Sequence, residues 1–120
     1  MIDVHCHLFK EYFENPAAAV PENFEYIVNT ADSAERCAEC LDISKKFDNV
    51  YFTAGIHPHN AGQEQMKCRE IIKYLDDEKC AAVGEIGLDY FYEFSDKKTQ
   101  KKVFDEMIKA ALDYKKNIVA

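Results

Sequence analysis

Ile2-Asp3-Val4-His5-Cys6-His7-Leu8 opens the chain as a short strand-like stretch that carries two histidines. Side chains on a strand alternate between faces, so His5 and His7 are expected to point the same way. Two imidazoles on one face suit a divalent metal ion. Two ordinary polar residues at a strand end are the alternative, and this stretch alone does not decide between them.

A second pair of histidines lies in Gly55-Ile56-His57-Pro58-His59, just after a predicted strand over residues 50–55. Pro58 fixes its own φ and biases His57 toward extended backbone. The resulting stiff loop can present two imidazoles to an anionic substrate or a metal. A loop with two solvated histidines is the alternative.

The third motif is Gly84-Glu85-Ile86-Gly87-Leu88-Asp89-Tyr90, at the end of another apolar stretch. A glutamate at the end of a buried strand must be paired, hydrogen-bonded or bound to a cation to offset its desolvation. Gly84 and Gly87 leave room for close backbone approach or unusual torsions. A structural salt bridge of Glu85 is the alternative.

Between these motifs, strand and helix patterns alternate along the chain. The apolar patterns predict strands over residues 2–5, 24–30, 50–55 and 80–86, and the opening of a fifth at 117–120. Helices are expected from Asp32 or Ser33 to about 47, over 63–78, and from a Ser95 cap through 96–116. This order predicts a parallel α/β sheet with right-handed crossovers. No glycine-rich phosphate loop follows the first strand, which favours a barrel of βα units over an open sheet.

The three motifs fall at the ends of the first, third and fourth predicted strands. In a parallel sheet or barrel those ends share one rim, where active sites form. Two histidines and a carboxylate with open positions suit hydrolytic metal chemistry. We also expect Asp3, on the same strand face as His5 and His7, to accept a hydrogen bond from an imidazole.

Composition limits the remaining function classes. The 120 residues, 48% apolar and 31% charged, predict one soluble domain, and neither a membrane span nor a signal peptide is expected. A net charge of −7 gives no electrostatic case for nucleic-acid binding, except where bound metal ions reverse the local charge. The five cysteines, including Cys37 and Cys40, are expected to be structural thiols of a cytoplasmic protein.

Together the three motifs resemble the N-terminal signatures of the TatD-related metal-dependent deoxyribonucleases, in the same order and with similar spacing. Gln100 and Phe104 also match residues usual in that family's next helix. The resemblance implies a TIM-like (β/α)8 barrel that hydrolyses phosphodiesters, typically trimming DNA from an end. It also implies two divalent metal ions as cofactors, with Mg²⁺, Mn²⁺ and Zn²⁺ as the candidates.

The same resemblance assigns roles to individual residues. His5 and His7 would bind the first metal, and Glu85 would bind a metal and bridge the pair. His57 and Glu85 are the predicted catalytic residues, with a metal-activated water attacking phosphorus. The predicted contacts to DNA, or to another phosphodiester substrate, come from four residues of the second and third motifs: His57, His59, Asp89 and Tyr90.

The chain is short for this family. A complete barrel needs roughly 250 residues, whereas residues 1–120 correspond to about the first four βα units and end within the fifth strand. Further histidines and a late aspartate implied by the resemblance are absent. We therefore expect a half barrel with reduced metal affinity and weak or absent hydrolysis. Its open strand edges predict association with the missing C-terminal half or self-association.

Two other functions stay open. One is another His-x-His barrel hydrolase that acts on phosphate monoesters or amides. The other is a catalytically inactive fragment that serves as an assembly piece. Lysines at residues 97, 98, 101 and 102 are interpreted as a solvated helix face, with contact to a phosphate backbone as the weaker interpretation.

Overall fold

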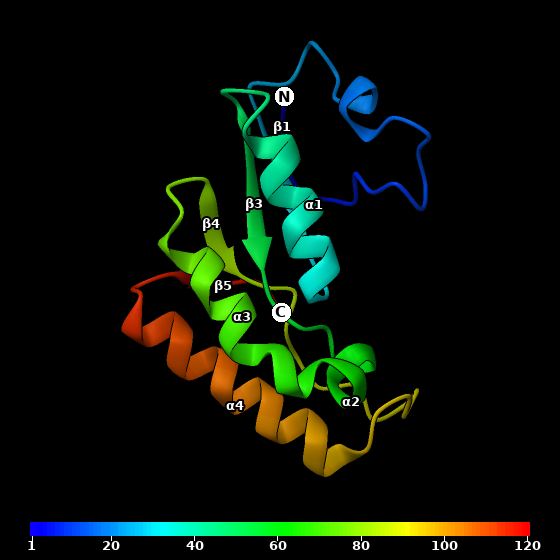
Figure 1. The fold of residues 1–120 in the computed structure, drawn as a ribbon, viewed down its shortest axis with the longest axis vertical. Helices are drawn as coiled ribbons and strands as arrows, with labels where there is room; N and C mark the ends of the chain where they lie inside the picture. The colour runs from blue at the N-terminus through cyan, green and yellow to red at the C-terminus, as the bar shows by residue number, and fades with distance from the viewer.

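A computed structural model describes residues 1–120 as one parallel sheet covered by helices (Figure 1). The strand order β1-β2-β3-β4-β5 follows the order of the chain, and every neighbouring pair is parallel. This is the arrangement of half a βα barrel, so the predicted fold class is confirmed. The strands are β1 (Ile2–Cys6), β2 (Tyr26–Thr30), β3 (Val50–Ala54), β4 (Cys80–Val83) and β5 (Asn117–Ile118).

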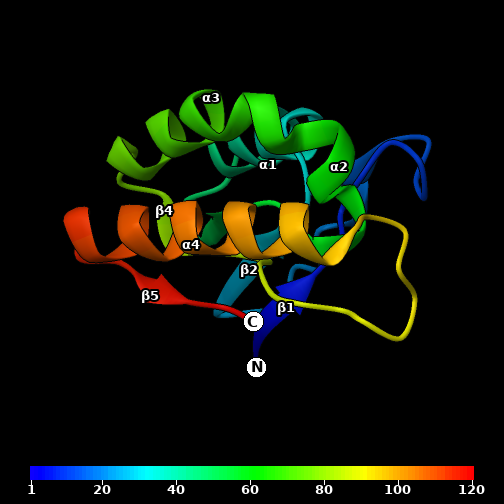
Figure 2. The same ribbon diagram turned by 90° about the horizontal axis from the view of Figure 1, so that it is seen from below.

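The helices gather on one side of the sheet (Figure 2). None of them is both long and apolar enough to cross a bilayer. The α-helices are α1 (Ala34–Ser44), α2 (Ala61–Glu64), α3 (Cys68–Ile72) and α4 (Lys97–Asp113). Four short 3-10 helices accompany them: η1 (Pro16–Ala19), η2 (Pro58–Asn60), η3 (Gln65–Lys67) and η4 (Lys73–Asp76).

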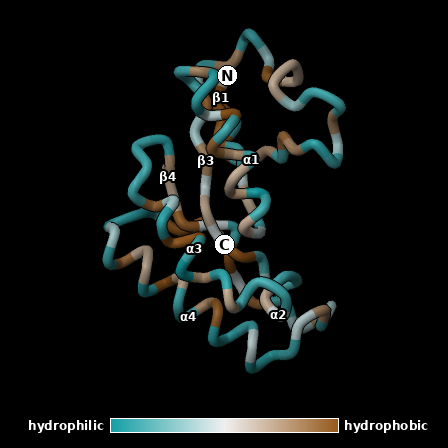
Figure 3. Tube along the Cα trace, viewed as in Figure 1, coloured by the Kyte–Doolittle hydropathy of each residue, from teal (hydrophilic) through white to brown (hydrophobic).

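The main core lies between the sheet and these helices. β3 is rich in β-branched and aromatic residues, which favour a strand, and its Phe52 is fully buried among residues such as Ile71 and Met107. Hydrophobic and hydrophilic colours alternate along α3 and α4 in Figure 3, as expected for helices with one buried stripe. Burial of that stripe holds the helices against the sheet and fixes the strand ends that carry the three motifs.

The cysteines are core residues, as predicted. All five are free thiols, and four of them are buried, Cys6 being half-buried. Cys37 and Cys40 form part of the buried stripe of α1. The C-x-x-C spacing thus serves helix packing.

The structure corrects two predictions about helices. Residues 63–78 form α2, η3, α3 and η4 rather than one helix, because the buried Glu64 carboxylate accepts a hydrogen bond from the Ala34 amide of α1 (3.0 Å). α4 is capped by Asp96, which accepts from the Thr99 amide (3.0 Å), and not by Ser95. In the first place a contact with the distant helix α1 accompanies the break, and in the second the Ser95 hydroxyl is bonded to His59 and Gly62 instead of to the helix.

The sheet face away from the helices carries exposed apolar side chains. Ile2 and Val4 of β1 and Tyr26 of β2 are exposed on this face. β1 and β5 are also the two edges of the sheet. A closed barrel would bury this face and pair both edges.

Two glycines allow close approach of neighbouring strands. A Cβ atom at Gly55 would lie 2.6 Å from the carbonyl carbon of Gly84, and one at Gly84 would lie 2.7 Å from Val119. A Cβ atom at Gly87 would meet nothing within 4 Å, so the predicted close approach at Gly87 is wrong. None of the glycines has a positive φ, and the one unusual torsion at these positions is the cis peptide bond between Gly84 and Glu85.

We expect Gly55→Ala to lower the free energy of unfolding by about 1–3 kcal/mol, because the added methyl group meets backbone atoms that cannot rotate away. Gly87→Ala is the matched control and should stay within about 1 kcal/mol of the wild type. Urea unfolding followed by circular dichroism measures both values. Equal stability of the two variants would contradict the close packing of the strand ends.

Burial raises the pKa of the Cys37 and Cys68 thiols to about 12 and that of Cys80 to about 11. At pH 8 the folded protein should therefore react with iodoacetamide at these positions at least ~100-fold more slowly than the urea-unfolded protein. Peptide mass spectrometry over a time course gives the rate at each cysteine. Modification of Cys37 at the unfolded rate would show that the C-x-x-C pair is not part of the core.

Candidate metal site at the strand ends

A small cavity of about 250 Å³ opens where the parallel strands end. It lies beside residues that follow β1, β2, β3 and β4. This agrees with the prediction that the ends of the parallel strands share one rim. Four of the sequence-predicted site residues line it, and four further residues join them. The lining consists of His7, Phe9, Tyr12, Asp32, His57, His59, Asn60 and Glu85.

His5, His7 and Glu85 come together although His7 and Glu85 are 78 positions apart in the chain. One ligand atom from each residue lies within 4.8 Å of the others. His5 Nε2 is 3.4 Å from Glu85 Oε2, and the two imidazole rings meet edge to face with centroids 5.0 Å apart. The structure thus gathers the three predicted metal ligands at one point.

Main-chain contacts from β2 hold the end of β1 in place. His7 Nδ1 donates to the Thr30 carbonyl (3.0 Å), which leaves Nε2 unprotonated in the neutral tautomer. The buried Asn29 side chain accepts from the Leu8 amide (2.8 Å) and donates to the Leu8 carbonyl (3.3 Å). These bonds fix the backbone beside His7, and neither partner was predicted from the sequence.

The predicted role of Asp3 is wrong. The pairing register of β1 with β2 shifts between Asp3 and Cys6, so simple alternation does not hold along this strand. Asp3 pairs with the buried Ile27, and its carboxylate accepts from the backbone amide of His5 (3.0 Å). The imidazole acceptor that was expected from Asp3 is the Thr30 carbonyl.

His57 lies near the other oxygen of the Glu85 carboxylate from the one that His5 faces. Its Nε2 lies 3.6 Å from Glu85 Oε1, while its Nδ1 accepts from the His59 amide (3.2 Å). This pattern puts the proton of the neutral ring on Nε2, facing the carboxylate. Burial lowers the pKa of His57, and the nearby Glu85 charge opposes that shift.

His59 links the cavity to the loop that follows β4. Its Nε2 donates to Asp89 Oδ2 (2.7 Å), and this bond is the main cause of the lowered pKa of Asp89. Asp89 and Tyr90 do not line the cavity. Asp89 reaches it through His59, and the Tyr90 ring lies instead under Lys97, whose Nζ is 5.3 Å from the ring centroid.

Gln100 is the residue that holds this loop. Its buried amide accepts from the Asp89 amide (2.8 Å) and donates to the carbonyls of Asp89 (2.9 Å) and Ser95 (2.7 Å). The Ser95 hydroxyl donates to the His59 carbonyl (2.9 Å) and accepts from the Gly62 amide (2.8 Å). A polar residue on the apolar stripe of α4 is the sequence signal for such a structural contact.

Asp32 lines the cavity, although the sequence analysis did not place it at the site. It follows β2, so the strand-end argument that found the other motifs also applies to it. Its carbonyl accepts from the His57 amide (3.0 Å) and from Asn60 Nδ2 (3.2 Å), which ties the ends of β2 and β3 together.

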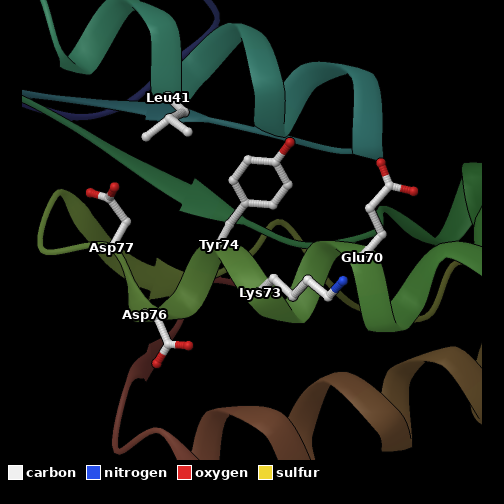
Figure 4. A pocket seen from close by; sticks show the side chains of 6 residues that line it. All are labelled: Leu41, Glu70, Lys73, Tyr74, Asp76 and Asp77. Atoms are coloured by element: carbon white, nitrogen blue, oxygen red, sulfur yellow. The ribbon is translucent and has the colours of Figure 1, made fainter.

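The largest concave region of the molecule lies elsewhere. It measures about 470 Å³ and lies between α1 and the α3–η4 segment, where the Tyr74 ring stands between the two elements (Figure 4). Its lining contains no histidine. The three carboxylates in it, Glu70, Asp76 and Asp77, have no imidazole beside them. We therefore place the site in the smaller cavity, where imidazole and carboxylate groups converge.

The gathered residues fit a divalent metal ion. Two imidazoles and one carboxylate are ligands common to hydrolytic metal sites, and they leave positions open for water and substrate. The bond from His7 to the Thr30 carbonyl orients one ligand as such sites require. The Glu85 side chain is 25% exposed and close to two imidazoles, so a cation there would offset its partial desolvation.

Comparisons with known proteins agree with this arrangement. A sequence model of the family described as "TatD related DNase" matches residues 2–120. An "Uncharacterized metal-dependent hydrolase" of Buchnera aphidicola is 30% identical over 127 residues, covering 99% of this chain and 48% of that relative. The human "3'-5' RNA nuclease TATDN2" is 29% identical over 133 residues, covering 98% of this chain and 18% of its own length.

The fold comparison leads to the same family. The crystal structure of YJJV, a TatD homologue from Escherichia coli, superposes with a TM-score of 0.85 and 27% identity, over 98% of this chain and 49% of that one. The chain thus spans about half the length of YJJV and of the Buchnera hydrolase. The chain belongs to the TatD-related DNase family of metal-dependent hydrolases.

Proposed function

We propose that the protein containing this chain hydrolyses phosphodiester bonds of nucleic acid at the rim of its barrel. The observation that carries the proposal is the convergence of His5, His7 and Glu85 within 4.8 Å of one another. The family description, and the nuclease name of the human relative, support nucleic acid as the substrate.

His5, His7 and Glu85 would hold a divalent ion. When bound, that ion supplies positive charge to the phosphate oxygens and lowers the pKa of a water molecule that attacks phosphorus. Glu85 would also help to hold a second ion, since its two carboxylate oxygens face different histidines at 3.4 and 3.6 Å. Mg²⁺, Mn²⁺ and Zn²⁺ are the candidate metals.

His57 and His59 would position the phosphate. The Nε2–H group of His57 points toward Glu85, so it can donate a hydrogen bond to a phosphate oxygen that occupies the space beside that carboxylate. His59 is held by Asp89 and stands beside His57, with ring centroids 4.4 Å apart. Fixed donors aimed at the charged group stabilise it more than mobile side chains would.

We propose that a second barrel half covers the exposed sheet face. Apolar residues such as Ile2, Val4 and Tyr26 are exposed there, and both edge strands lack a neighbour. The relatives' greater length supports a covalently continuous second half. Catalytic activity is therefore proposed for the full-length protein, with residues 1–120 alone expected to bind metal weakly and to turn over slowly.

We expect the full-length protein to cleave single-stranded or double-stranded oligonucleotides when Mg²⁺, Mn²⁺ or Zn²⁺ is added, and to lose this activity with EDTA. Glu85→Gln should lower kcat/KM on the order of 100-fold or more, because the amide cannot provide the negative charge that the cation requires. Gel analysis of end-labelled DNA and RNA measures the rates. Glu70→Gln, an exposed glutamate on α3, is the matched control and should leave the rates unchanged.

Two outcomes would favour other functions. Hydrolysis of p-nitrophenyl phosphate or of a cyclic amide, with intact oligonucleotides, would indicate a phosphomonoesterase or an amidohydrolase. No metal-dependent turnover of any of these substrates by the full-length protein would indicate a role in assembly.

A further inference from the structure

The loop between β4 and α4 carries exposed aromatic side chains beside the candidate site. Phe91, Tyr92 and Phe94 are 85%, 57% and 72% exposed. The rings of Tyr92 and Phe94 are nearly parallel, with an interplanar angle of 15° and centroids 6.1 Å apart. Large exposed apolar side chains that cluster in one place are typical of an interaction site. We call Tyr92 and Phe94 the aromatic platform.

The aromatic platform adjoins the residues proposed to bind phosphate. The His59 ring meets Phe94 edge to face at 4.8 Å and Tyr92 at 6.4 Å between centroids. Contact with His59 does not explain the rings by itself, because more than half of each side chain stays exposed. Both rings therefore stay largely exposed beside His59, one of the residues proposed to position the phosphate.

The backbone of the platform is held in a defined conformation. Asp89 Oδ1 accepts from the amides of Phe91 (3.0 Å) and Tyr92 (3.1 Å). The Gln100 amide bonds to the Asp89 backbone and also to the carbonyl of Ser95, the residue directly after Phe94. Ordering the loop in advance reduces the entropy lost when a ligand binds to its rings.

The side chains of the loop suit a flat, neutral nucleobase better than the charged phosphodiester backbone. The chain has a net charge of −7, and Lys97 beside the loop is already paired with Glu93 (3.1 Å). Base–aromatic stacking needs no positive charge and accepts any base. A base within a duplex is stacked and paired, so only an unpaired base can lie on such rings.

We propose that Tyr92 and Phe94 bind an unpaired nucleobase of the substrate strand, next to the phosphate that is cleaved. This inference rests on the proposed function and adds a position at which the enzyme holds its substrate. The platform would align the terminal nucleotide with His57 and His59, and it would favour single-stranded ends over blunt duplex ends.

Binding of a single-stranded oligonucleotide to the full-length protein tests the proposal without turnover. The probe has hydrolysis-resistant phosphorothioate linkages and carries 2-aminopurine at its 5′ or 3′ end, because stacking changes the fluorescence of that base. A second probe has an abasic terminal nucleotide and an internal label. The variants are the double substitution Tyr92→Leu/Phe94→Leu, the ring-preserving pair Tyr92→Phe/Phe94→Tyr, and Leu112→Ala as an exposed apolar control on α4.

The double leucine variant should bind the 2-aminopurine probe roughly 10-fold more weakly and bind the abasic probe within about twofold of the wild type. The ring-preserving pair and Leu112→Ala should match the wild type on both probes. Equal weakening on both probes would overturn the proposal, because it would indicate a general loss of the site. Unchanged binding by the double variant would overturn it too, and would indicate that another part of the protein covers the rings.

The two proposals fail in different ways. A wild-type protein that binds the 2-aminopurine probe through the platform, but cleaves no natural strand, would overturn the proposed function alone. A Tyr92→Leu/Phe94→Leu variant that cleaves DNA or RNA with the same kcat/KM as the wild type would overturn the platform alone.

Discussion

The arrangement of the candidate site depends on the Glu85 carboxylate at the end of β4. Parallel pairing brings the carboxyl ends of β1, β3 and β4 to one rim, and Glu85 stands there between His5 and His57 at 3.4 and 3.6 Å. A carboxylate with only 25% of its side chain exposed requires partners that offset its desolvation. The imidazoles provide part of this compensation, and a bound cation would complete it.

A surrounding layer of hydrogen bonds keeps these groups in position. On one side, Asn29 and the Thr30 carbonyl hold the chain around His7. On the other, the Gln100 amide holds Asp89, which in turn holds His59. Sites whose supporting residues are themselves fixed keep the geometry that metal binding and phosphate recognition require.

The strands and the three histidine and glutamate motifs could be predicted from sequence, because apolar runs and strand-end polar residues are local patterns. The orientation of Asp3 could not, since a register shift in β1 breaks the two-residue alternation. The division of residues 63–78 was missed for a related reason: the buried Glu64 bonds to α1, 30 positions away in the chain. Gln100 was matched to the family's next helix without a role, and its partners could not be predicted because they depend on the folded loop.

The central claim is that His5, His7 and Glu85 hold a catalytic divalent ion. Crystals of the full-length protein grown with Mn²⁺ and measured for anomalous scattering test it most directly. We expect an anomalous peak within bonding distance of both imidazoles and the Glu85 carboxylate, and loss of that peak in Glu85→Gln. A peak bonded to other residues, or a well-ordered cavity without any peak at saturating Mn²⁺, would contradict the account.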